Sequence, residues 1–229
     1  ALVAFYGMIG SERGIFRVSA SGGTPVRLSD ALGRDDTIYF LEVSVDGALC
    51  LYERRTTIVD DLLFVVADYS NLHCVSVAGG TPVQLTQHHL DGYFASYPRL
   101  TADASHVTYR REAFYQYGVA TDGSGSPVLL AFSFRAESSP DGTRLAYLDG
   151  FLGSMGRLMT ADLDGGDARF LSGPTLQGAV LGDVEEFAPT PNELHVLYTN
   201  SYVGSKFHVV GAGGGSPALD VPFDPVSGK

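Results

Sequence analysis

The sequence predicts an all-β protein that is built from similar consecutive units of four short strands. A glycine-rich turn recurs five times along the chain, and a turn with Asp or Asn recurs four times between the glycine-rich turns. Short runs of alternating apolar residues lie beside these turns, as half-buried strands require. The apolar residues follow no clean helical period, so helical repeats and α/β folds are disfavoured.

Composition narrows the class of protein further. The chain has 229 residues, of which 45% are apolar, so it can bury a core and is not expected to be disordered. Its net charge of −11 would repel a phosphate backbone, and we expect no nucleic-acid partner. No apolar run approaches the length that a bilayer crossing needs, so we expect a soluble, acidic protein without a membrane-spanning segment.

The glycine-rich turns share their sequence and their surroundings. Their second positions are residues 23, 80, 125, 166 and 215, which gives intervals of 57, 45, 41 and 49 residues. Four of the five turns are followed at a fixed offset by leucine, namely Leu28, Leu85, Leu130 and Leu171. Gly-Gly supplies positive φ, and the proline that often follows starts a strand without needing a donor. Each unit therefore contains a hairpin.

The second kind of turn is followed by tyrosine six residues later. The pairs are Asp46/Tyr52, Asp103/Tyr109, Asp141/Tyr147 and Asn192/Tyr198. A complete unit thus reads strand, Asp turn, strand, loop, strand, glycine turn, strand. Four antiparallel strands in a unit of roughly 40–50 residues are typical of a β-propeller blade. We interpret the repeated tyrosine as a packing position between blades.

The two ends of the chain look complementary. Residues 223–229 resemble the start of a blade up to its turn, and residues 1–6 resemble the strand after that turn. We therefore predict one β-propeller domain over residues 1–229, with five four-stranded blades and a first blade closed by the C-terminal strand. Such closure would remove the free sheet edges. The alternative is a piece of a longer propeller, or a part of a larger complex.

The second unit is longer than the others. Its 57-residue interval includes residues 56–70, which predict either an extra strand or an inserted hairpin. Cys50 and Cys74 fall on the second and third strands of this unit. Neighbouring strands can hold a disulfide, so one bond and two buried free thiols both stay open. Two cysteines exclude a disulfide-rich scaffold and a four-thiolate zinc site.

Two segments carry a family resemblance. The stretch PDGTRLAY at residues 140–147, followed by LMTADLDGG at residues 158–166, resembles the TolB-type β-propeller repeat. That repeat is similar to the propellers of tricorn protease and of dipeptidyl-peptidase-like enzymes. The resemblance implies the propeller fold over nearly the whole chain and a periplasmic or secreted location. In that family, many members are binding or scaffold modules, and others are gating domains fused to a peptidase.

The first strand of each blade in a propeller lines the central channel, so charged residues there are candidate ligand contacts. These channel candidates are Glu42, Arg99, Glu137, Glu185, Glu186 and Asp224. Most are acidic, which suits a cation, a basic peptide, or carbohydrate chemistry between two carboxylates. The alternative is a set of solvated charges, some of them paired with Arg99 or Arg135.

Loops at the rim supply a second set of candidates. Those expected between second and third strands are Arg54, Arg55, Arg110, Arg111, Asp149, Phe151 and Tyr202. Those expected at the entry to a blade are His88, His89, Asp91, Tyr93 and residues 172–186. Paired arginines could hold a carboxylate or phosphate by bidentate contacts, or they could be ordinary surface residues that balance acidic neighbours.

Metal chemistry has weak support in the sequence. His88 and His89 have no evident third ligand, and adjacent strand residues point to opposite faces. Residues 162–167 (DLDGGD) are similar to a calcium loop but lack its downstream glutamate, so we predict a structural turn. We expect no cofactor and no bound metal, with calcium as the one cation left open.

The chain contains no nucleophile elbow and no phosphate-binding loop, so we expect no catalytic activity in it. The function predicted is a non-catalytic binding or scaffold propeller that recognises a peptide or protein at its loop rim or central channel. One alternative is a five-bladed glycosidase that uses channel carboxylates, which the absence of tryptophan disfavours. The others are a glycan-binding propeller and the gating propeller of a larger peptidase.

Overall fold

A computed structural model describes most of the chain, and the described residues form β-strands, turns and connections. They are residues 1–60, 65–87, 95–112, 114–133, 135–139, 142–149, 157–171, 184–189, 195–200, 206–211 and 219–221. The chain divides into two compact units, Ala1–Ala113 with Tyr117–Val128, and Phe114–Gln116 with Leu129–Lys229. Within the described ranges, no helix has the length and apolar character needed to span a membrane.

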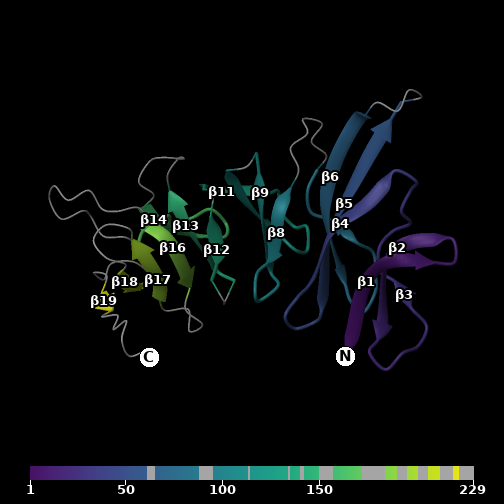
Figure 1. Cartoon of the computed structure of the whole chain (residues 1–229), viewed down its shortest axis with the longest axis horizontal. Helices are drawn as coiled ribbons and strands as arrows, with labels where there is room; N and C mark the ends of the chain where they lie inside the picture. The colour runs from purple at the N-terminus through teal and green to yellow at the C-terminus, as the bar shows by residue number, and fades with distance from the viewer. Residues whose placement is uncertain are drawn as a thin grey trace. The chain divides into compact units, whose positions relative to one another are not determined.

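The described strands form five antiparallel sheets, and in each sheet the strand order follows the chain (Figure 1). The first has three strands: β1 (Leu2–Ile9), β2 (Glu12–Ser19) and β3 (Val26–Arg27). The second, which we call the second blade, has β4 (Asp36–Val43), β5 (Leu49–Val59), β6 (Val65–Ser76) and β7 (Val83–Gln84). The third has β8 (Ser96–Leu100), β9 (His106–Arg111), β10 (Tyr115–Ala120) and β11 (Val128–Phe132).

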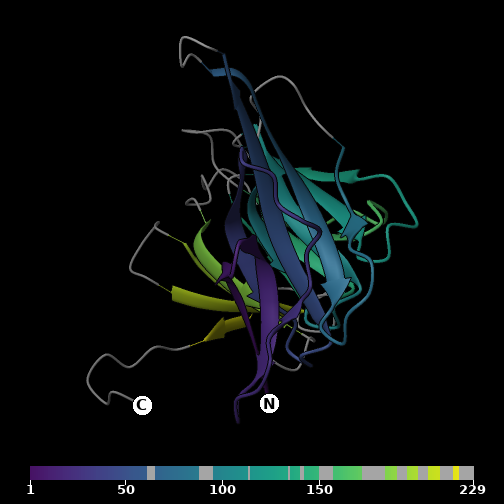
Figure 2. The ribbon, with the colours of Figure 1, turned by 90° about the vertical axis from the view of Figure 1, so that its right-hand side faces the viewer.

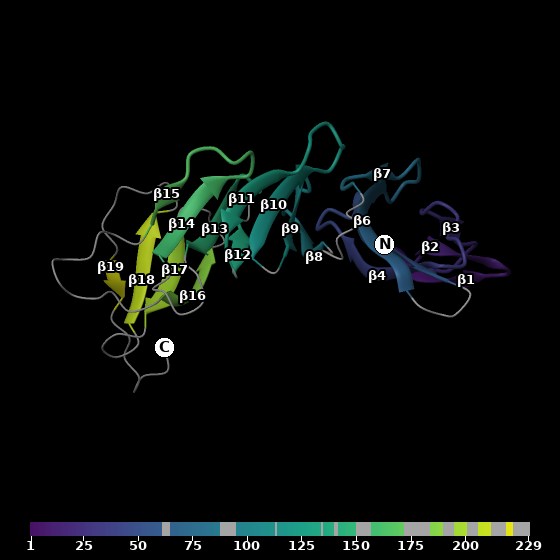
Figure 3. The same cartoon turned by 90° about the horizontal axis from the view of Figure 1, so that it is seen from above.

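The last two sheets repeat this pattern. One has β12 (Ala136–Ser138), β13 (Arg144–Asp149), β14 (Arg157–Asp162) and β15 (Arg169–Phe170). The other has β16 (Val184–Pro189), β17 (His195–Asn200), β18 (Lys206–Gly211) and β19 (Leu219–Val221). Figure 3 shows each of them as a group of neighbouring strands. The predicted unit of four antiparallel strands is therefore confirmed for the second, third, fourth and fifth sheets.

The first sheet is one strand short among the described residues. The strand predicted to complete it, residues 223–229, lies outside them. The closed ring of five blades and the single domain over residues 1–229 therefore stay predictions.

Both kinds of predicted turn form where the sequence places them. In the turns at Asp46 and Asp103, the carboxylate accepts hydrogen bonds from the hydroxyl two residues before it and the amide two residues after it. These four distances run from 2.6 to 3.0 Å. In the glycine turns, Gly79 and Gly80 adopt φ of 110° and 130°, which only glycine reaches without strain. The predicted turns at Asp141, Asn192 and Gly215 lie outside the described residues.

The repeated leucine and tyrosine positions form the core. All four leucines and all four tyrosines are at most 8% exposed, as a shared packing position requires. Tyr109 of β9 packs in one cluster with Leu51 and Leu72 of the second blade. This contact between neighbouring blades fits the role that the sequence predicts for the tyrosine.

The long second unit contains an extended hairpin, which Figure 2 shows as the long pair of blue strands. Strand β5 has 11 residues and β6 has 12, and their pairing runs from Leu49↔Ser76 to Val59↔Val65. Residues 56–59 and 65–70 thus lengthen two existing strands. This fits the inserted-hairpin prediction, and the described part of the segment forms no additional strand.

The same register decides the state of the two cysteines. Cys50 lies opposite Val75, while Cys74 lies opposite Leu51. Adjacent positions point to opposite faces of a sheet, so the two thiols lie on different sides of the second blade. Both are buried and free, and a disulfide between them is excluded by the geometry.

Candidate binding site

The second blade has a different chemistry on each face. Cys50 and Tyr52 of β5 belong to one core cluster, and Leu51 belongs to another, because successive strand residues point to opposite sides. The same alternation continues toward the hairpin tip, where the side chains become polar. Arg54 therefore lies on the face of Tyr52, and Arg55 lies on the face of Leu51. A groove and a pocket lie at this polar end, one on each face.

This alternation corrects the prediction that paired arginines occupy loops. Arg54 and Arg55 lie within β5, and Arg110 and Arg111 end β9. Neighbouring residues of a strand diverge, so neither pair can close around one carboxylate or phosphate. The separate partners agree: Arg54 Nη2 donates to Asp36 at 2.6 Å, and Arg55 Nε donates to Asp68 at 2.7 Å.

The groove lies on the face of Arg55 and has a volume of about 410 Å³. Its walls come from β4, from β5 and from the start of the third sheet. The lining residues are Tyr39, Phe40, Glu53, Arg55, Ala95, Ser96, Tyr97, Pro98 and Arg99. The groove thus runs between the first strands of the second and third sheets, where the sequence predicts ligand contacts.

Two tyrosines dominate the groove surface. Tyr39 and Tyr97 are 62% and 73% exposed, whereas the four tyrosines that follow the Asp or Asn turns are buried. The Arg55 guanidinium lies 5.0 Å from the ring centre of Tyr39, and that of Arg110 lies 4.0 Å from the ring centre of Tyr97. Cation–π contact of this kind orders an exposed ring while leaving its other face open to a ligand.

The backbone at Tyr97 is unusual as well. Its φ is 54°, in the left-handed region, and the register between β8 and β9 shifts between Ser96 and Arg99. This β-bulge turns the tyrosine outward at a position where glycine is the unstrained residue. Strain of this kind costs about 1–3 kcal/mol and tends to persist where function requires it.

The charged side chains in the groove, Arg55 and Glu53, interact with nearby charged or hydrogen-bonding groups. Hydrogen bonding to Arg55 lowers the pKa of Asp68, and the bond to Asp68 raises the pKa of Arg55. Burial raises the pKa of Glu53, while a hydrogen bond with Ser70 and the charge of Arg55 act in the opposite direction. The groove therefore exposes the ring of Tyr39, and the arginine that contacts this ring, Arg55, is itself paired with Asp68.

Two of the predicted channel residues meet at the edge of the groove. Glu42 of β4 accepts a hydrogen bond from the amide of Leu100 at 3.1 Å, and its other oxygen lies 3.9 Å from Arg99 Nη1. The carboxylate therefore joins β4 to β8. This matches the alternative in which the acidic residues are paired with arginine.

The other predicted site residues are more scattered. Glu137 is exposed on β12, and Glu185 and Glu186 lie at a bulge of β16. Their placement on first strands agrees with the sequence, and their roles stay predictions. Asp149 ends β13, and Arg111 Nε lies 3.9 Å from Glu112. The remaining candidates lie outside the described residues: His88, His89, Asp91, Tyr93, Phe151, residues 172–183, Tyr202 and Asp224.

The pocket lies on the opposite face of the second blade and has a volume of about 370 Å³. Its lining residues are Gly33, Arg34, Asp35, Asp36, Arg54, Thr56, Tyr69, Asn71, His73 and Gln84. Burial alone would raise the pKa of Asp36, but hydrogen bonds from Arg54, Thr56 and Gly33 more than offset it and lower the pKa. Of these residues, only Arg54 was a candidate from the sequence.

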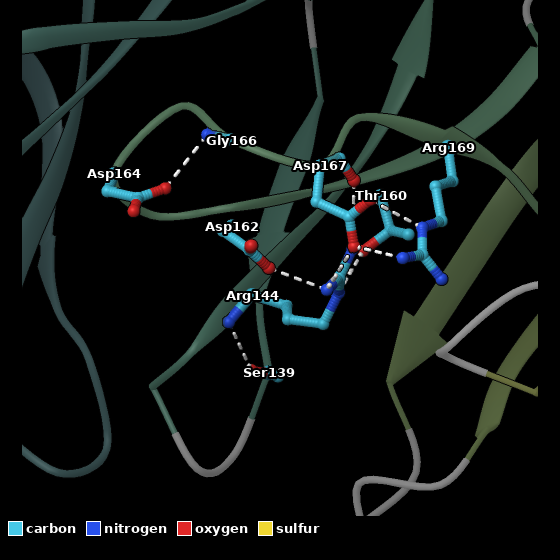
Figure 4. Close-up of polar contacts among 8 residues, drawn as sticks. All are labelled: Ser139, Arg144, Thr160, Asp162, Asp164, Gly166, Asp167 and Arg169. Atoms are coloured by element: carbon cyan, nitrogen blue, oxygen red, sulfur yellow. Dashed lines mark hydrogen bonds and ion pairs between the residues drawn. The ribbon is translucent and has the colours of Figure 1, made fainter.

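The turn that resembles a calcium loop is held by arginine in this structure (Figure 4). Arg144 Nη1 lies 2.5 Å from Asp162 Oδ1 and 3.6 Å from Asp167 Oδ2. Asp164 accepts a hydrogen bond from the amide of Gly166 at 2.8 Å. Each acid thus has a protein partner, as a structural turn requires. Within the described ranges, no three His, Cys, Asp or Glu residues lie close enough to hold a metal ion.

Comparison with known proteins bears on the fold. No family model and no curated protein sequence matches the chain. A dipeptidyl peptidase 4 from Porphyromonas gingivalis is similar at a TM-score of 0.62 and 15% identity, over 97% of this chain and 37% of that one. An oligogalacturonate lyase in complex with manganese reaches 0.58 at 13% identity, over 96% and 62%. TolB from Acinetobacter baumannii reaches 0.43 at 18% identity, over 93% and 49%.

At these identities the likeness concerns the fold alone. The chain is similar in fold to the lyase and peptidase propellers. TolB is also among the matched structures, as the repeat motif predicts. It spans between 37% and 62% of the length of these three proteins. Their activities therefore do not follow for this chain from the comparison.

Proposed function

We propose that the chain is a non-catalytic propeller module that binds an extended peptide or protein segment in the groove between β4 and β8. The observation that carries this proposal is Tyr97. Its ring is displayed at a strained bulge, highly exposed, and ordered by Arg110 from the neighbouring strand. A core position would not need this arrangement, whereas a binding surface uses rigid aromatic anchors.

The composition of the groove supports a polypeptide ligand. Tyrosine and arginine are among the residues enriched at protein interfaces. Here each of two exposed tyrosines is in cation–π contact with an arginine. An extended segment could place apolar side chains against Tyr39 and Tyr97, and its carbonyl or carboxylate oxygens could accept hydrogen bonds from Arg99.

The surroundings of Glu42 favour binding over glycoside hydrolysis. A catalytic carboxyl has to reach the substrate, but Glu42 is engaged by the Leu100 amide and by Arg99. The proposal includes the ring of five blades, the extracytoplasmic location implied by the repeat, and function without a cofactor. A gating role beside a peptidase is compatible with the same groove, since gating also requires recognition of a polypeptide.

A random peptide library displayed on phage tests the proposal. We expect the wild-type chain to enrich a set of related peptides that the double variant Tyr39→Ala/Tyr97→Ala does not capture. The matched control is Tyr6→Ala, which removes a half-exposed tyrosine of β1 that does not line the groove. Failure to enrich any sequence family, or equal capture by the wild type and the double variant, would overturn the proposal.

A further inference from the structure

We propose that the pocket on the other face of the second blade binds a small hydroxylated monocarboxylate. The pocket, lined as described above around Arg54, has a volume of about 370 Å³. This size lies in the range of small-molecule sites in proteins. It is separate from the peptide groove, because Arg54 and Arg55 point to opposite sides of β5.

The pocket lining includes buried polar side chains. His73 lies seven residues before the second glycine of its turn, a position that varies between the units: Phe16 in the first, Gly118 in the third, Met159 in the fourth and His208 in the fifth. Compared with the first and fourth units, whose side chains here are 3% and 8% exposed, the second blade thus buries an imidazole, 6% exposed, in place of an apolar group. Asn71, two residues earlier on the same face, is buried as well.

Arg54 is positioned to hold an anion. Asp36 fixes the guanidinium through Nη2 at 2.6 Å and is itself fixed by Thr56 Oγ1 and the Gly33 amide, both at 2.6 Å. This bond uses one of the five N–H donors of arginine. No other acceptor among the described residues lies within hydrogen-bond distance of Arg54, and its side chain is 30% exposed. The remaining donors form the planar fork that binds a carboxylate in a bidentate manner.

The rest of the lining selects the class of ligand. Two arginines and two aspartates give the pocket a formal charge near zero, so a single carboxylate suits it better than a dianionic phosphate. Tyr69, Asn71 and Gln84 add hydroxyl and amide groups, which pair with the hydroxyls of a ligand. The Gln84 amide nitrogen donates to the Thr86 carbonyl at 2.7 Å and to Asn71 Oδ1 at 3.4 Å, which orients the amide and leaves its oxygen as the group that accepts from a ligand hydroxyl. A hydroxy acid satisfies both parts of the lining.

Titration calorimetry with the full chain tests the inference. The probes are L-lactate, D-glycerate and D-gluconate, compared with acetate, D-glucose and inorganic phosphate. We expect at least one hydroxy acid to bind more tightly than all three comparison compounds. Arg54→Gln should weaken that binding by about tenfold or more, since a hydrogen bond to a charged group is lost. Arg27→Gln, which alters an arginine outside the pocket, should leave it unchanged.

A second variant guards against a folding defect in Arg54→Gln. His73→Phe gives the second blade the residue that the first carries at this position, so it should fold and still weaken binding by filling the pocket. Tyr97→Ala should have no effect on the hydroxy acid, because it alters the groove alone. The inference is overturned if no hydroxy acid binds, if phosphate binds more tightly than every hydroxy acid, or if His73→Phe binds like the wild type.

Discussion

Tyr97 combines an exposed ring with a backbone conformation that favours glycine. Because its φ is 54°, we expect glycine to be more stabilising than alanine at this position, the reverse of the usual order in a strand. Tyr97→Gly and Tyr97→Ala both remove the ring and its contact with Arg110, so their difference isolates the backbone. We expect the glycine variant to be more stable by about 1 kcal/mol in urea unfolding, because only glycine adopts this φ without strain.

The matched pair is Tyr39→Gly and Tyr39→Ala in β4, where the backbone has no positive φ. There the alanine variant should be the more stable one by about 0.5–1 kcal/mol, since glycine loses more entropy in a strand. The same order at both positions would show that the bulge at Tyr97 stores no strain.

Glu53 gives the stability of the protein a specific pH dependence. Burial raises its pKa in the folded state, so the folded chain keeps this proton at a pH where the unfolded chain has lost it. The contribution of Glu53 to stability is therefore present below the unfolded pKa and is lost as pH rises through the folded pKa. Glu53→Gln avoids this loss, so we expect its stability relative to the wild type to increase over that window.

Urea unfolding of both proteins at a series of pH values measures the difference. Asp36 and Asp68, whose lowered pKa values produce the opposite slope, are present in both proteins and cancel. A difference that stays constant with pH, or that falls as pH rises, would contradict the assignment.

At the scale of elements, Arg144 joins β13, β14 and the following turn. Besides Asp162 and Asp167, it reaches the Thr160 hydroxyl at 3.1 Å and the Asp167 carbonyl at 3.2 Å (Figure 4). We expect Arg144→Met to lower the free energy of unfolding by about 1–2 kcal/mol, after allowance for solvent screening. Arg27→Met, which removes one exposed pair with Glu12, should cost about 0.5 kcal/mol or less.

Chemical unfolding measures both variants. Since Arg144 already neutralises the acids of this turn, we also expect added calcium to leave the unfolding midpoint of the wild type unchanged. Equal effects of the two substitutions, or a midpoint that rises with calcium, would argue against a structural turn held by Arg144.

Elements differ in how far the sequence predicts them. The turns at Asp46 and Gly80 and the buried leucines were predictable, because each depends on residues close together in the chain. The groove and the pocket were not, because they depend on how far β5 and β6 extend. The charged run Glu53–Arg54–Arg55 is typical of a loop, and its partners Asp36 and Asp68 are distant in sequence. Because β5 pairs with β6 through this run, the run is a strand, and Arg54 and Arg55 therefore point to opposite faces of the sheet.

At the scale of the whole molecule, the two thiols report on unfolding. Burial raises the pKa of Cys50 to about 12 and that of Cys74 to about 11, so neither forms a reactive thiolate at neutral pH. We expect a thiol-specific reagent to label neither cysteine in the folded protein and both cysteines in denaturant without reductant. Rapid labelling of the folded protein, or no labelling of the unfolded one, would contradict two buried free thiols.

The groove between β4 and β8, which displays Tyr39 and Tyr97, is proposed to bind a polypeptide. Titration calorimetry of the strongest peptide selected on the wild type tests it most directly, with groove and pocket variants measured side by side. We expect Tyr97→Ala to weaken binding by about tenfold or more. His73→Phe, which lies on the other face of the second blade, should leave the affinity unchanged. Equal affinity of the wild type and Tyr97→Ala, or a loss confined to His73→Phe, would contradict it.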